Sequence, residues 1–74
     1  MNRYKVDRAY TLQAPVGMTG VLHVGDDLAI ARKVFDQAKP GFSPWGELHP
    51  NCGILLTEWK ETSYTVLMSK GIQP

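Results

Sequence analysis

The segment from residue 53 to residue 68 constrains the fold most, because it has the pattern of a β-hairpin that is apolar on both faces. Side chains along a strand point alternately to opposite sides, so a sheet with one face in water alternates apolar and polar residues. The two predicted strands, 53–59 and 64–68, instead carry apolar residues on both sides. The chain offers one convincing helix to cover them. We therefore expect part of this apolar surface to need a second partner.

The pairing of the two strands defines the faces of this hairpin. If Trp59 pairs with Tyr64, Leu55 lies opposite Met68. The larger apolar face is predicted to pack against the helix and holds Leu55, Trp59, Tyr64, Val66 and Met68. The other face is predicted to stay open and holds Ile54, Leu56 and Leu67. A shift of the pairing by one residue would exchange the two faces.

Two shorter strands and a helix are predicted before the hairpin. Residues 3–12 alternate between apolar and polar types and are rich in β-formers, and residues 21–24 are typical of a second strand antiparallel to the first. Residues 28–38 then repeat apolar side chains with a period of about 3.6, after two aspartates that can cap the first helical turn. A Pro-Gly pair ends the helix. This order predicts an α+β fold, ββαββ, in which an antiparallel sheet carries a single helix on one face.

The length of 74 residues predicts one small domain over residues 1–74. A domain of this size buries about 60% of the surface of its unfolded chain, so its core is marginal. The lone cysteine, Cys52, excludes an intrachain disulfide, which leaves good packing or self-association to stabilise the fold. One alternative is therefore a homodimer in which Ile54, Leu56 and Leu67 are buried symmetrically.

Charge argues against a dominant role in binding polyanions. The formal net charge is +1, whereas domains that hold nucleic acid electrostatically are usually much more basic. The first strand does interleave cations with aromatic rings, but its alternation turns the tyrosines Tyr4 and Tyr10 toward the core rather than toward bases. Arg8 falls on that same side and is expected at a sheet edge or beside a carboxylate. A small nucleic-acid-binding protein remains an alternative.

Localisation follows from what the sequence lacks. The apolar stretches are only a few residues long, and charged residues occupy the N-terminus where a signal peptide needs an apolar region. A single cysteine fits a reducing compartment. The sequence therefore predicts a cytoplasmic protein with no membrane partner.

The pair His49 and Cys52 is the one candidate for chemistry. Imidazole and thiolate are good zinc ligands, but a structural site needs four ligands; the only other histidine is His23, and Glu47 is a contrived third ligand. As a thiol nucleophile, Cys52 would need an electropositive environment and an orienting group. The simpler interpretation makes Cys52 a small buried residue and His49 a loop residue. We predict no metal, no cofactor and no enzymatic activity.

The connection over residues 40–53 is the stronger functional candidate. Its three prolines and three glycines predict irregular structure, and long loops in compact domains are often functional. Trp45 has the side chain most enriched at binding hot spots, and a loop held by proline presents it at low entropic cost. The alternative, weighed equally, is that Phe42 and Trp45 fold back to cap the core. The predicted binding residues are Phe42, Trp45, Ile54, Leu56 and Leu67.

In general build the chain resembles the small α+β proteins that bacteriophages and other mobile elements encode to disable host proteins. The resemblance rests on the 74-residue length, on a helix that begins Asp27-Leu28-Ala29-Ile30-Ala31-Arg32, and on the terminal hairpin. It implies a non-catalytic inhibitor or accessory factor that binds a host transcription or defence protein and occludes a surface on it. The resemblance transfers no functional residue to this chain.

Overall fold

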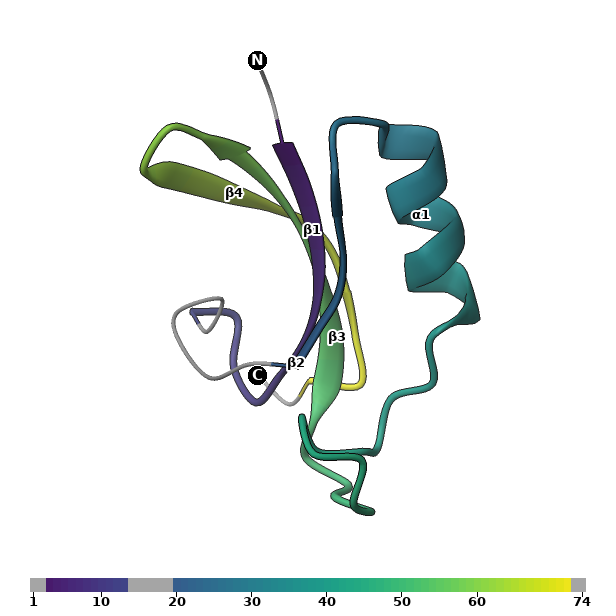
Figure 1. Cartoon of the computed structure of the whole chain (residues 1–74). Coiled ribbons are helices and arrows are strands. Elements are labelled where there is room, and N and C mark those ends of the chain that lie inside the picture. Colours follow the sequence, from purple (N-terminus) through teal and green to yellow (C-terminus); the bar gives the residue numbers. More distant parts are fainter. Residues whose placement is uncertain (1–2, 14–19, 73–74) are drawn as a thin grey trace.

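The computed structural model describes residues 3–13 and 20–72 and contains the predicted ββαββ order. The elements are β1 (Arg3–Ala9), β2 (Gly20–Gly25), α1 (Leu28–Gln37), β3 (Gly53–Lys60) and β4 (Ser63–Lys70). The strands form one antiparallel sheet in the order β2-β1-β3-β4, and α1 packs across one face over β2, β1 and β3 (Figure 1). The prediction of an antiparallel sheet with a helix on one face is confirmed.

The helix begins at a side-chain cap. The Oδ1 atom of Asp27 accepts hydrogen bonds from the backbone N–H groups of Ala29 at 2.9 Å and of Ile30 at 3.3 Å. These donors have no partner within a helix, so the carboxylate satisfies them and also suits the positive end of the helix dipole. At the other end Ala38 is already extended, and Pro40 follows two residues later. The helix therefore starts and stops where the sequence predicts.

The core lies between α1 and the central strands. Its fully or nearly fully buried residues are Val6, Ala31, Phe35, Ile54 and Leu56. The edge strand β4 joins this layer through Lys70, whose Nζ lies 4.8 Å above the Phe35 ring and donates a hydrogen bond to the Asp36 carbonyl at 3.3 Å. A long side chain from the far edge of the sheet thus reaches the helix.

The prediction of which hairpin face meets the helix is wrong. Ile54 and Leu56 are 0% exposed and pack with Ala31 and Phe35, although the sequence predicted that they lie on the open face. The physical reason lies in β1, where Val6 pairs with Leu56 and also enters the core. Residues directly opposite in a sheet share a face. Because Val6 of β1 faces α1, Leu56 of β3 faces α1 as well.

A β-bulge moves Met68 as well. The pairing of Trp59 with Tyr64 is confirmed, but the register shifts after Leu56, so Leu56 rather than Leu55 lies opposite Met68. One extra residue in a strand turns all later side chains to the other face. Met68 therefore packs against the helix-side core.

Two side chains of β3 on the face away from α1 are also fully buried. Leu55 and Thr57 are 0% exposed there, and the Trp59 indole reaches back to donate a hydrogen bond to the Thr57 hydroxyl at 3.0 Å. The hairpin end of β3 and β4 curves away from α1, and residues 10–13 run on the same side of the sheet (Figure 1). The folded chain thus buries much of the apolar surface that was expected to need a partner.

Within residues 3–13 and 20–72, no helix has the length and apolar character needed to cross a bilayer, since a crossing takes about 20 residues.

Candidate functional site

The connection between α1 and β3 is more ordered than its prolines and glycines predicted. Gly41 N–H donates to the Cys52 carbonyl at 2.7 Å, and His49 N–H donates to the Gly41 carbonyl at 2.7 Å. Phe42 and Leu48 form an antiparallel bridge. The segment therefore folds back on itself as a short hairpin-like loop, and we call residues 42–48 the Trp45 loop.

One serine fixes the tip of the Trp45 loop. The Ser43 side chain is 2% exposed, and its Oγ accepts hydrogen bonds from the N–H groups of Trp45 at 3.2 Å and of Glu47 at 3.1 Å. Ser43 N–H donates to the Glu47 carbonyl at 2.7 Å, and Gly46 takes the positive φ of +86° that the tight turn requires. The tip is consequently a defined turn.

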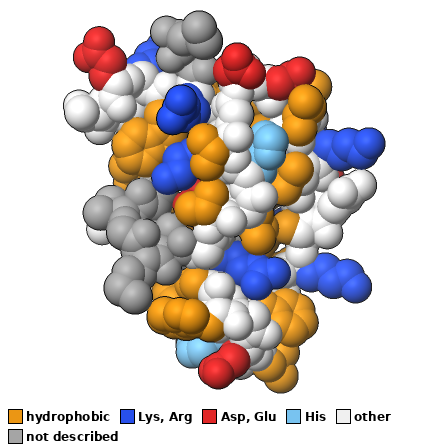
Figure 2. Space-filling view, viewed as in Figure 1, with side chains coloured by type: hydrophobic (Ala, Val, Ile, Leu, Met, Phe, Trp, Pro, Cys, Tyr) orange, Lys and Arg blue, Asp and Glu red, His pale blue; other side chains and the backbone are white. Residues whose placement is uncertain are grey.

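This turn presents large apolar side chains to solvent. Trp45 is 69% exposed and Leu48 is 78% exposed. Figure 2 shows hydrophobic side chains gathered at the lower end of the molecule, where Figure 1 places this connection. The alternative in which Trp45 caps the core is therefore wrong. Phe42 is half-buried beside the helix end.

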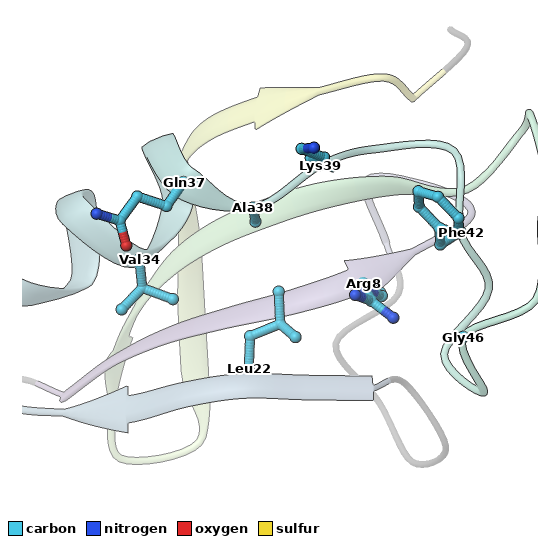
Figure 3. A pocket seen from close by; sticks show the side chains of 8 residues that line it. All are labelled: Arg8, Leu22, Val34, Gln37, Ala38, Lys39, Phe42 and Gly46. Carbon is cyan, nitrogen blue, oxygen red and sulfur yellow. The ribbon is translucent and has the colours of Figure 1, made fainter.

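A groove of about 520 Å³ lies between the Trp45 loop, the last turn of α1 and the helix-side face of β1 and β2 (Figure 3). Its lining residues are Arg8, Leu22, Val34, Gln37, Ala38, Lys39, Phe42 and Gly46. The helix ends before it can cover this part of the sheet. The Trp45 loop packs against the start of β2. The contact is so close that a Cβ atom on Gly20 would lie 3.0 Å from the Pro44 Cα atom.

Arg8 is one of the polar residues of this groove, together with Gln37 and Lys39. It lies in the middle of the sheet on β1 rather than at the expected sheet edge. Its Nη1 donates a hydrogen bond of 3.3 Å to the Ser43 carbonyl, and its buried Nε has no hydrogen-bond partner in the described structure. The guanidinium thus supports the loop while retaining donors for another acceptor.

The predicted binding residues do not form one surface. Ile54 and Leu56 are buried under α1, so they are not available to a partner or to a dimer contact in this fold. Leu67 is 38% exposed on the edge strand β4, and β3 and β1 separate it from the start of β2, where the Trp45 loop packs. Phe42 and Trp45 belong to the same loop and remain together.

The side chains of His49 and Cys52 lie in different surroundings. Burial raises the pKa of the Cys52 thiol, although the Arg8 charge and a hydrogen bond involving the Ala9 backbone act in the opposite direction. The His49 ring instead packs edge-on against Tyr10, with ring centres 5.0 Å apart. Among the residues that the structure describes, no cluster of three or more histidine, cysteine or carboxylate side chains could hold a metal ion.

A second aromatic cluster lies on the sheet face away from α1. Trp59 stacks on Tyr64 with ring centres 5.0 Å apart, and the Lys5 ammonium lies 5.3 Å from the Trp59 ring centre. A hollow of about 380 Å³ beside them is lined by Arg3, Lys5, Trp59 and Glu61. Tyr64 and Lys5 therefore both lie against the Trp59 ring.

Sequence reasoning missed Arg8, Leu22 and Lys39 as groove residues. Arg8 gave a signal, because it interrupts the apolar side of the first strand. Leu22 and Lys39 gave no such signal in the sequence, because the groove forms only where β2 and the end of α1 lie side by side in the fold. The positions of these elements are set by tertiary packing.

The fold and the groove define a small α+β protein with a hydrogen-bonded aromatic loop beside a cationic, largely apolar groove. Comparisons of the chain with protein-family models, with curated proteins and with solved structures found no match.

Proposed function

We propose that the chain is a non-catalytic module that binds another protein through the Trp45 loop. The observation that carries this proposal is the exposure of Trp45 on a turn held by Ser43. A large ring in water is unfavourable, and a rigid backbone lowers the entropic cost of placing it in a partner's pocket. Tryptophan dominates the measured energetics of many interfaces.

The non-catalytic part of the proposal is supported by the state of the candidate nucleophile. Cys52 is fully buried, does not line the groove, and has a raised pKa. A thiol in such an environment is a poor nucleophile, because the thiolate is the reactive form. Binding would then act by occluding the partner's surface, and an inhibitory role requires that the partner lose activity in the complex.

Affinity capture tests the proposal. The immobilised chain is exposed to a bacterial lysate, and retained proteins are identified by mass spectrometry. We expect a discrete protein on the wild-type chain, and we expect Trp45→Ala to weaken its binding by about 30-fold, which corresponds to a hot-spot loss of about 2 kcal/mol. Because the Trp45 side chain lies in solvent, this variant should unfold at the wild-type temperature.

The matched control is Ile30→Ser. Ile30 is 51% exposed on α1 and lies outside the Trp45 loop, so its replacement should leave capture unchanged. Equal retention by the wild type and by Trp45→Ala would refute the proposal. Retention that disappears after nuclease treatment would favour nucleic acid instead, with Arg3, Lys5 and Trp59 as the residues to replace next.

A further inference from the structure

We infer that the groove beside the Trp45 loop binds a carboxylate side chain of the partner, an Asp or Glu flanked by an apolar residue. This inference rests on the proposed function and specifies the chemistry of the segment that is bound. The occupant is an extended peptide segment, because the groove places the polar residues Arg8, Gln37 and Lys39 beside apolar walls, which a polar side chain and its apolar neighbours can fill together (Figure 3).

Charge complementarity is the first argument. The lining residues include the cations Arg8 and Lys39 and no aspartate or glutamate. A cation within an apolar surrounding is stabilised by an opposite charge, and the low local dielectric strengthens that attraction. A carboxylate is therefore the group that this lining favours.

The hydrogen bonding of Arg8 is the second argument. Among the described residues, its guanidinium donates one hydrogen bond, the long contact of 3.3 Å to the Ser43 carbonyl, and its buried Nε has no acceptor there. Arginine presents its donors in a planar fork that matches the two oxygens of a carboxylate. The buried Nε itself is closed to solvent, so an acidic side chain in the groove would accept hydrogen bonds from the terminal N–H groups of Arg8 that do not bond Ser43.

The apolar walls are the third argument. Leu22, Val34, Ala38 and Phe42 line the groove, whose volume of about 520 Å³ exceeds what one carboxylate fills. Apolar side chains next to the acidic residue would occupy the remaining space and displace water from these walls. Gly46 belongs both to this lining and to the Trp45 loop, so one partner can contact both.

Peptide selection tests the inference. A displayed library of random peptides is selected on the wild-type chain, and the affinity of a chosen peptide is measured by titration calorimetry. We expect enrichment of an Asp or Glu next to an apolar residue. Replacing that acid by its amide should weaken binding by about 10-fold or more, as expected for a lost charge-assisted hydrogen bond. Arg8→Gln should weaken binding of the acidic peptide to a similar extent and the amide peptide much less.

Two lysines keep the test independent of the structural role of Arg8. Lys39→Gln changes an exposed residue in the lining and should also weaken the acidic peptide, whereas Lys33→Gln changes an exposed residue of α1 outside the lining and should not. Selected peptides without an acid, equal affinity for the acid and amide forms, or no selected peptide would each overturn the inference. If lysate capture still depends on Trp45 in that case, the proposed function stands and only the groove chemistry fails.

Discussion

Burial decides the chemistry of Cys52. The thiol is 0% exposed, and its Sγ lies 3.9 Å from the Gly53 carbonyl oxygen. Removing the thiolate from water costs free energy, and this effect outweighs the nearby positive charge of Arg8, so the pKa rises from its ordinary value of 9.0. The spacing of His49 and Cys52 in the sequence resembled half a metal site, but position in the fold makes Cys52 a small core residue.

The raised pKa predicts a loss of stability at alkaline pH. In the unfolded chain Cys52 ionises near pH 9.0, whereas in the folded chain it stays protonated to higher pH. The unfolded state then binds fewer protons, so the free energy of unfolding falls as the pH rises above 9.0. Urea unfolding measures the free energy of unfolding of the wild type and of Cys52→Ala. The difference between the two should be constant from about pH 6 to 8, and above that range the wild type should lose stability relative to Cys52→Ala. A constant difference up to about pH 10.5 would contradict the burial argument.

At the scale of the element, α1 depends on its N-terminal cap. Asp26 and Asp27 were equivalent candidates in the sequence, and the structure assigns the role to Asp27. The helix has ten residues, which is too short to be stable alone in water, so capping and packing must hold it together. Its buried positions, Ala31 and Phe35, provide the packing.

Loss of the cap should therefore be measurable in the whole protein. Asp27→Ala removes the acceptor of two backbone N–H groups and should lower the free energy of unfolding by about 1 kcal/mol. For a domain of this size the thermal midpoint should fall by about 4–8 °C. Asp26→Ala is the matched control and should change the midpoint by much less. Equal effects of the two substitutions would show that helix-dipole charge, rather than the cap, is what matters.

At the scale of the molecule, the choice of hairpin face determines which residues stabilise the fold and which remain available to a partner. The hairpin carries apolar residues on both faces, and α1 could in principle cover either one. In the folded chain Leu56 belongs to the core and Leu67 lies on an edge strand. A pair of truncations at these positions separates the two roles.

Leu56→Ala should cost about 2–5 kcal/mol, because it removes buried methyl groups and leaves a cavity. The total stability of a chain this long is only about 4–11 kcal/mol, so this variant should be largely unfolded in mild denaturant. Leu67→Ala, at a partly exposed position, should cost less than about 1 kcal/mol. Denaturant titration followed by circular dichroism compares them. A milder effect at Leu56 than at Leu67 would contradict the observed face.

The sequence determined the local structure of this protein. Alternation in the first strand, the helical period with its aspartate cap and Pro-Gly stop, and the pairing of Trp59 with Tyr64 all arise from interactions between residues close in the chain. Such interactions do not depend on the rest of the fold, so ββαββ could be predicted from the residues alone.

Only the tertiary structure decided which face of the hairpin meets α1, where the β-bulge lies, and which residues line the groove. Pairing of Val6 with Leu56 joins residues 50 positions apart and sets which side of β3 meets the helix. The groove likewise needs Arg8, the end of α1 and the Trp45 loop to meet in space. A strand that is apolar on both sides can bury either face, so the hairpin sequence alone does not fix which face meets the helix. The contacts of the whole chain make the choice.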